Sequence, residues 1–352
     1  MSETTALPRR VADRRGGVPI FGLMGAALLV IVFAELVLGP VQLGMGDLLA
    51  VLVGEGERGP TAILLQIRLP RAVLGLAVGL GLALSGCAMQ GVLRNPLADP
   101  GLIGVTAGAA VGAVTVIVLG NYFVGDLPAP VRPYALPLGA FIGGMAVTGF
   151  VFSLSHRSGG TNVAMLILAG VAVNAIAGAL IGAMVYISDD QQLRDLTFWS
   201  MGSIASGNWM QVSVTTALAL AAALGLLTMG RSLDLFQLGE RAAFHAGIDI
   251  EREKWRIALL TAIAVGAVTA AAGPIGFIGL VAPHMARLIV GPAHRNVLPA
   301  AALIGGALIL GADLAVRMVV PPTEPPIGLA TSMIGGPFFL WLLMRRMKRG
   351  GL

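Results

Sequence analysis

Long apolar runs, interrupted at short intervals by glycine, proline or charged residues, occupy almost the whole chain. A helix that crosses the hydrocarbon core of a bilayer needs about 20 mainly apolar residues. Runs of that length predict ten membrane-spanning helices, so the expected fold class is an all-α polytopic membrane protein. The expected spans are 18–39, 64–92, 100–120, 133–155, 162–187, 209–230, 255–272, 274–291, 297–320 and 327–345.

The first span and the seventh span have boundaries that rest on specific residues. The run 18–39 is longer than the ~7–15 apolar residues of a signal peptide, and no small-residue cleavage site follows it. We therefore expect an uncleaved first helix. Only Gly273 and Pro274 separate the seventh and eighth spans. Proline can begin a helix there because the first turn does not use the N–H that proline lacks.

The composition fits a membrane protein without a resident metal or cofactor. Hydrophobic residues make up 56% of the chain and charged residues 12%, with a mean hydropathy of +0.87, whereas about a quarter of a soluble domain is charged. The 49 glycines suit closely packed membrane helices. The single Cys87 excludes an internal disulfide and a multi-cysteine metal site. The four histidines lack zinc-ligand spacing, so no metal site is expected.

The basic residues orient the spans. An even number of spans puts both termini on one side, and a cytoplasmic placement leaves 17 of the 23 Lys and Arg residues inside, as the positive-inside rule predicts. The net charge therefore reports topology and does not indicate nucleic-acid binding. We expect cytoplasmic tails at 1–17 and 347–352, and one transmembrane domain, 18–346, with a polar cytoplasmic segment at 233–256. The outer basic residues are Arg58, Arg68, Arg71, Arg132, Arg194 and Arg317.

The sequence carries no machinery for binding ATP or for hydrolysis. No Gly-Lys pair occurs, so the phosphate-binding loop is absent and any ATP must be bound by another subunit. Neither G-x-S-x-G nor H-E-x-x-H occurs, so no enzyme is expected. A gradient-driven carrier, the alternative, usually has ionisable residues near the midplane. Glu35, Asp313 and Arg317 lie towards the outer ends of their spans, and Asp313 and Arg317 are spaced for an ion pair on one helix.

Two polar motifs border the second span. At its outer start, IRLPR (67–71) places two arginines at the external surface. They either anchor the helix at the interface or receive an acidic partner, because arginine binds carboxylates with a rigid fork. At its inner end, QGVLRNPLADPGLIG (90–104) contains Asn95-Pro96, which favours a turn, and Asp99-Pro100, which is typical of a helix start.

The third polar motif is LDLFQLGERAAFHAGIDIEREKWR (233–256), the longest polar segment after the N-terminal tail. Its pattern predicts a short helix from about Leu238 to Ala246, ended by Gly247 in a left-handed conformation, and a second helical piece from Asp249. A solvated loop does not need the small residues on one face of the first piece. Such residues suit insertion into a groove of a partner.

A weak internal repeat is also visible. GLIGVTAG (101–108) resembles GPIGFIGL (273–280), and the two segments lie in spans of opposite direction. Inverted-topology repeats show this relationship, although a chain rich in Gly and Ala also produces such matches by chance. The pattern favours an inverted repeat of helices 2–5 and 7–10.

Together these motifs resemble the permease family of the vitamin B12, ferric-siderophore and haem importers that ATP-binding-cassette subunits drive. The resemblance extends from about Arg68 to Arg345. The residues that carry it are RLPR (68–71), SGCAMQGVLRNPLADPGLIG (85–104), LGERAAFHAGI (238–248), GPIGFIGLVAPHMARLIVG (273–291) and PPIGLATSMIGGPFFLWLL (325–343).

The resemblance implies a homodimeric type II importer permease, with two ATPase subunits that bind ATP and Mg²⁺ and a periplasmic binding protein that delivers substrate. It assigns docking of that binding protein to Arg68, Arg71 and Arg317. One departure concerns His245-Ala246, where this family often has leucine or a similar residue. The resemblance assigns ATPase coupling to Leu238, Gly239, Glu240, Ala242, Ala243, Ala246, Gly247 and Ile248.

The substrate expectation is haem, with a ferric siderophore second and vitamin B12 third. It rests on the outer segment SDDQQLRDLTFWSMGS (188–203), which looks most like haem-importing members. On the fifth span, Asn174 lies among small residues that leave room for a bulky substrate along a dimer axis, or that simply allow close packing. The pathway candidates are Val171, Asn174, Ala175 and Gly178. The expected location is the bacterial cytoplasmic (inner) membrane.

Overall fold

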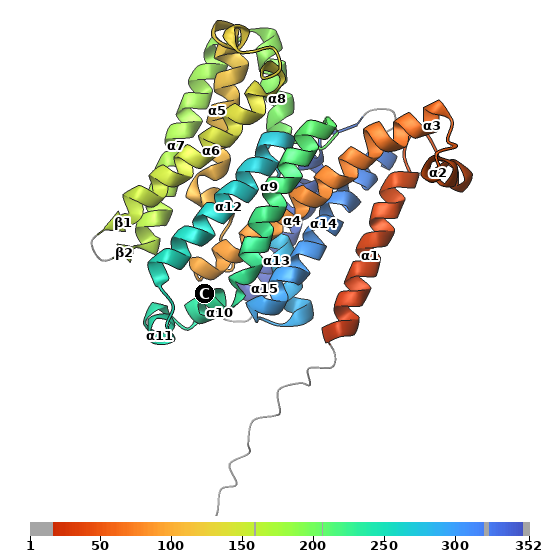
Figure 1. Cartoon of the computed structure of the whole chain (residues 1–352). Coiled ribbons are helices and arrows are strands. Elements are labelled where there is room, and N and C mark those ends of the chain that lie inside the picture. The colour runs from red at the N-terminus through yellow and green to blue at the C-terminus, as the bar shows by residue number, and fades with distance from the viewer. Residues whose placement is uncertain (1–16, 158–159, 206, 320–323, 348–352) are drawn as a thin grey trace, which may run out of the picture.

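A computed structural model describes residues 17–157, 160–205, 207–319 and 324–347 of the chain, and all ten expected spans are helices in it (Figure 1). Eight helical segments are long and apolar enough to cross a membrane, and two apolar helices are shorter. The ten helices are α1 (Gly17–Val37), α4 (Leu69–Val92), α5 (Val105–Leu119), α6 (Ala135–Ser155), α7 (Val163–Ile187), α9 (Trp209–Thr228), α12 (Ile250–Ala272), α13 (Ile278–Val290), α14 (His294–Val319) and α15 (Ile327–Met347).

Helix α4 is the centre of the bundle. It packs against α9, α12, α13 and α14, and its span is 83% buried. Helices α5, α6 and α7 form a second group beside α12, while α1 lies at the opposite edge against α14 (Figure 1). The span of α1 is only 6% buried, so this helix lies at the periphery of the chain.

Glycines allow the helices of the centre to cross at backbone distance. A Cβ added to Gly79 of α4 would lie 2.3 Å from the carbonyl oxygen of Gly305 on α14. A Cβ added to Gly86 would lie 2.0 Å from the carbonyl oxygen of Gly279 on α13. Because lipid gives helices no hydrophobic reason to associate, close packing of this kind is what holds a membrane bundle together.

The chain turns back between α12 and α13 inside the bundle. Gly273 and Phe277 both adopt positive φ, of 71° and 70°, and the 13 residues of α13 reach only about 20 Å at 1.5 Å per residue. The expectation of a full-length eighth span at 274–291 was therefore wrong. The corner is covered by the chain itself: Ser203 N–H donates to the carbonyl of Ala272 at 2.7 Å.

The described residues include short elements that the hydrophobic pattern did not predict. At one end of the bundle, called here the α2 end, lie α2, α3 and α8; at the other, the α11 end, lie α10, α11 and the β1–β2 hairpin (Figure 1). The short elements are α2 (Met45–Leu52), α3 (Arg58–Ala62), the π-helix Ile63–Arg68, the 3₁₀ turns Pro100–Ile103, Gly120–Tyr122, Val124–Asp126 and Arg132–Tyr134, β1 (His156–Arg157), β2 (Gly160–Thr161), α8 (Asp190–Met201), α10 (Gly230–Gln237) and α11 (Glu240–His245).

The two segments of the suspected repeat meet in space. A Cβ on Gly279 would lie 3.3 Å from Pro100 and 3.4 Å from the Asp99 carboxylate. Asp99 begins the 3₁₀ turn before α5 as expected, because its side chain accepts from Gly101 N–H at 2.8 Å. Helix α4 packs on α13 and α12 packs on α5, an exchange of partners that inverted repeats produce.

Candidate coupling, docking and pathway sites

Helix α10 anchors the polar segment at the α11 end. Leu233 and Phe236 of α10 are fully buried, and Asp234 accepts from the backbone N–H of His294 at 2.7 Å, at the start of α14. Gln237 donates to the carbonyl of Gly91 at 3.1 Å. The base of the segment is therefore fixed to α4 and α14, and α11 projects from it.

Glycine and aspartate set the bounds of α11 and α12. Gly239 precedes α11 with φ of 104°, and Gly247 follows it with φ of 82°. The N–H groups of Gly247 and Ile248 donate back to Phe244 and Ala243, which closes the helix. Asp249 then begins α12, because its carboxylate accepts from Arg252 N–H at 3.1 Å. The predicted left-handed cap is confirmed, while the second helical piece is the first turn of α12.

The structure divides the predicted coupling residues between two faces. Ala243 is fully buried and packs into the core. It therefore contributes to the chain's own core and is not accessible to a partner. Gly239, Glu240 and Ile248 are partly buried. The exposed members are Leu238, Ala242, Ala246 and Gly247.

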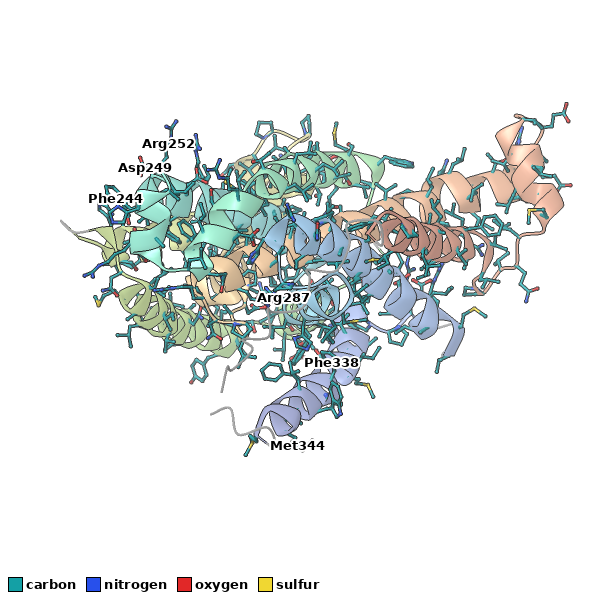
Figure 2. The ribbon with its side chains drawn as sticks, turned by 90° about the horizontal axis from the view of Figure 1, so that it is seen from below. Phe244, Asp249, Arg252, Arg287, Phe338 and Met344 are labelled. Atoms are coloured by element: carbon teal, nitrogen blue, oxygen red, sulfur yellow. The ribbon has the colours of Figure 1, made fainter. Side chains whose placement is uncertain are left out.

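Sequence reasoning missed the largest exposed side chain of α11. Phe244 is 67% exposed, beside Leu238 at 72%. Seen from the α11 end, Phe244, Asp249 and Arg252 lie towards one edge and Arg287 nearer the middle (Figure 2). The signal that the sequence offered was a phenylalanine within a polar segment, since aromatic residues contribute strongly to binding energy at interfaces.

At the α2 end, Arg68 closes the end of α1. Its guanidinium donates to the carbonyls of Leu36 and Val37 at 2.7 and 2.6 Å and also to the carbonyl of Val41. The last carbonyls of a helix have no partner within it, and a cation there also complements the helix dipole. Arg68 is only 3% exposed.

Arg71 and Arg317 lie in one buried ion network. Arg71 binds Asp313 with two bonds, from Nε at 2.8 Å and from Nη2 at 2.9 Å, and its Nη1 donates to Glu324 at 2.6 Å. Arg317 lies 2.7 Å from the Glu35 carboxylate and 3.5 Å from Asp313. The expected Asp313–Arg317 ion pair is thus confirmed, as one link of a larger network.

All three predicted docking arginines therefore already have partners within the chain. Each is 3–4% exposed, and Glu35 and Asp313 are buried with them. Glu324 is the exception, with a side chain 38% exposed. Its pairing with Arg71 had no signal in the sequence, because Glu324 precedes α15 and lies 253 positions from Arg71 on α4.

The four pathway candidates share one region of α7. Val171 is 56% exposed, Ala175 and Gly178 are exposed, and nothing lies within 4 Å of the position where Gly178 would carry a Cβ. Asn174 is partly buried and donates to the carbonyl of Gly101 at 3.3 Å. It borders a cavity of about 460 Å³ between α7, the start of α5 and the α12–α13 corner. α7 thus presents an unpaired face next to a mainly apolar recess that Asp99 and Asn174 border.

A larger cavity lies at the α11 end. It measures about 820 Å³ and is bordered by Arg94, by residues 160–165 at the start of α7 and by residues 238–242 around the start of α11. Within the described residues no group of three or more His, Cys, Asp or Glu side chains could hold a metal ion. The candidate sites described above are two surfaces and a pathway.

Comparison with known proteins decides the family. The FecCD transport family matches residues 27–345, which is most of the chain. The chain belongs to the FecCD transport family. FecCD proteins of this kind are permease subunits of ABC importers, and this chain is a multi-pass membrane protein of that type.

Curated relatives of this FecCD permease cover its length. The hemin transport system permease protein HmuU of Yersinia pestis is 48% identical over 82% of this chain and 85% of its own. The cobalamin import system permease protein BtuC of Halobacterium salinarum is 38% identical over 88% and 78%. The iron(3+)-hydroxamate import system permease protein FhuG of Bacillus subtilis is 35% identical over 90% of this chain and 94% of its own.

A solved structure confirms the fold of the FecCD permease. An ABC transporter assigned to the metal-chelate type, in an inward-facing conformation, superposes with a TM-score of 0.83 at 31% identity. The superposition covers 93% of this chain and 99% of the other. The expected type II importer permease fold is confirmed.

Proposed function

We propose that this FecCD permease imports haem across a bacterial cytoplasmic membrane, powered by ATP that partner subunits hydrolyse. The observation that carries the substrate is the 48% identity with a hemin transport permease over most of both chains. The segment 188–203, which resembles haem-importing members, forms α8 and its flanks at the α2 end.

Ferric siderophores and vitamin B12 are the alternative substrates. Relatives named for cobalamin and for iron(3+)-hydroxamate import are 38% and 35% identical to this chain. Their lower identity ranks these substrates after haem. Haem, a ferric siderophore and cobalamin are all bulky metal chelates, so the same alternating-access pathway suits all three.

The coupling proposal places the ATPase at α11. The exposed side chains of Leu238 and Phe244, with Ala242 and Ala246 between and beside them, form a small apolar surface on a projecting helix. Two ATPase subunits, carrying ATP and Mg²⁺, would each receive one α11. Closure of the ATPase pair then displaces α11 and switches the pathway between its outward and inward openings.

A second copy of the chain completes the proposed pathway. Helix α7 is only 22% buried within one chain, and its pathway candidates lie at exposed or partly exposed positions. A homodimer would cover this face and enclose a channel for substrate along its axis. The distribution of basic residues supports cytoplasmic termini, with the α11 end inside and the α2 end outside.

The periplasmic binding protein is proposed to dock at the α2 end through Arg68, Arg71 and Arg317. Since all three are buried and paired, docking by acidic side chains would replace an internal carboxylate on Arg71 and Arg317, and backbone carbonyls on Arg68. Glu324 is the internal carboxylate nearest to solvent. The exchange therefore begins at the Arg71–Glu324 contact.

Reconstitution tests the whole proposal. The permease, its ATPase and its binding protein are placed in liposomes, and uptake of haem, a ferric siderophore and cobalamin is compared with and without ATP. We expect ATP-dependent uptake of haem above the other two. Uptake of haem at the same rate without ATP would contradict the importer mechanism and favour a gradient-driven carrier. Preferred uptake of cobalamin or siderophore would contradict the substrate alone.

A further inference from the structure

Lys254 is a buried cation at the α11 end. It is one of two lysines in the chain, it lies in the first turns of α12, and its side chain is 3% exposed. Burial of an ammonium group is costly unless the group is paired and hydrogen-bonded. Its Nζ donates to the carbonyl of Thr161 at 2.8 Å and lies 3.0 Å from Glu240 Oε1 and 3.6 Å from Glu251 Oε1.

These partners belong to three separate elements. Glu240 is the first residue of α11, Glu251 lies on α12, and Thr161 is on β2. Glu251 strengthens the junction because its Oε2 accepts from the Thr161 hydroxyl at 2.7 Å and lies 3.5 Å from His156 Nδ1 on β1. Figure 1 shows α11 and the hairpin on either side of the start of α12.

The hairpin leads directly into α7. Thr161 is followed by Asn162, whose side chain accepts from Met165 N–H at 3.1 Å and so caps the helix. The N–H of Asn162 donates to the carbonyl of Ser155 at 3.1 Å, which ties the hairpin to the end of α6. No flexible linker separates Thr161 from α7, so a displacement of the Thr161 backbone is a displacement of the end of α7.

We propose that Lys254 is a positioning residue that transmits the movement of α11 to the end of α7. The inference rests on the proposed function, in which the ATPase moves α11 and α7 lines the pathway. Loss of either Glu240 or Thr161 would leave the buried ammonium poorly compensated, so the three groups move together. Through the ammonium group of Lys254, α11 and the end of α7 move together.

The test compares variants in liposomes that contain the ATPase and the binding protein. Lys254→Met keeps the length of the side chain and removes its charge. We expect ATPase activity to persist while the ATP hydrolysed per transported substrate rises roughly five- to tenfold. Lys254→Arg, which keeps a cation, should restore most of the coupling. Arg252→Met, at an exposed position on the same helix, is the matched control and should keep the wild-type ratio.

A second variant keeps the test decisive if Lys254→Met fails to assemble. Glu240→Gln weakens only the contact with α11, because Lys254 retains Glu251 and Thr161. We expect the same rise in ATP per substrate with only a small fall in melting temperature, because the Glu240 side chain is 41% exposed and Lys254 keeps two other partners. Wild-type protein that does not transport with ATP would contradict the proposed function. Wild-type transport together with an unchanged ratio in Glu240→Gln and Lys254→Met would overturn this inference alone.

Discussion

The contact between Arg71 and Glu324 is the most accessible part of a buried charge network. Arg71 is held from within by both oxygens of Asp313, and Glu324 binds its remaining nitrogen from a side chain that is 38% exposed. A carboxylate from a docking protein has the same chemistry as Glu324. Glu324 therefore competes with any acidic partner for Arg71.

Glu324→Gln should make docking tighter. The substitution removes the internal competitor while leaving Asp313 on Arg71. Because partly exposed ion pairs are weak, we expect the dissociation constant of the loaded binding protein to fall about two- to fivefold. Surface plasmon resonance on permease–ATPase complexes in nanodiscs measures it. Glu57→Gln, an exposed acid at the same end, is the control, and weaker docking of Glu324→Gln would contradict a docking role for Arg71.

At the residue scale the sequence predicted types of side chain better than their partners. The outer placement of Arg68, Arg71 and Arg317 followed from charge counting, and the Asp313–Arg317 pair from helical spacing. Burial of the arginines did not follow, because Glu35 and Glu324 reach them from distant parts of the chain. Partners that depend on how helices pack leave no periodic signal in the sequence.

Elements of this fold meet through their smallest residues. Gly305 of α14 faces α4 so closely that a Cβ would lie 2.3 Å from the carbonyl of Gly79 and 2.6 Å from the Cβ of Ala83. Gly311, six residues further along α14, has nothing within 4 Å of that position. One helix thus offers a packed and an open glycine for comparison.

Gly305→Leu should separate α14 from α4 and destabilise the protein. Overpacking typically costs about 1–3 kcal/mol, and a clash with backbone lies at the upper end because backbone cannot yield as a side chain does. We expect a lower melting temperature in detergent, measured by intrinsic fluorescence. Gly311→Leu should melt close to the wild type. Equal melting temperatures for the two variants would show that α14 and α4 do not cross at Gly305.

The α11 segment shows what local sequence signals can and cannot give. Its position, its end at Gly247 and the cap at Asp249 followed from glycine and aspartate preferences. Its inner face did not, because the sequence does not show which of the small residues packs on the core. Ala243 packs inward, while Phe244, the next residue, points away from the core. Adjacent residues of α11 therefore have opposite environments, one in the core and the other at the surface.

Phe244→Ser and Ala243→Leu should fail in different ways. Loss of an exposed aromatic anchor should weaken association with the ATPase roughly tenfold or more at an unchanged melting temperature. Ala243→Leu should lower the melting temperature before association is affected. Pull-down with the ATPase and thermal melting separate the two. Tyr122→Ser, which removes an aromatic side chain that is 82% exposed at the α2 end, should leave both unchanged.

At the scale of the molecule, the ten helices and the family followed from sequence, since a bilayer requires long apolar runs. The shortness of α13 did not follow, because hydropathy reports which residues can lie in lipid and cannot report how far a helix extends. The sequence of α7 is apolar on every face, so it does not show which face of this helix lacks a partner in the chain. The proposed second copy of the chain rests on this face.

Ala175→Cys should cross-link two copies of the chain. Cys87, the single native cysteine, is fully buried, so an introduced thiol on the surface reacts selectively. If α7 faces its counterpart across the dimer axis, a short bifunctional thiol reagent should give a covalent dimer on a denaturing gel. Ala221→Cys, an exposed alanine at the middle of α9, should stay monomeric. Cross-linking through Ala221 in place of Ala175 would assign the dimer contact to α9.

The corner between α12 and α13 has a consequence for how such a machine can operate. Backbone groups from Gly273 to Phe277 are outside regular helix and cannot be left against hydrocarbon. Trp199 and Gly202 pack closely on Gly273, and Gly328 at the start of α15 packs on Met201 and Pro274. We therefore expect these packed segments to stay together and to move as one unit during transport, while the helices that join them change their packing.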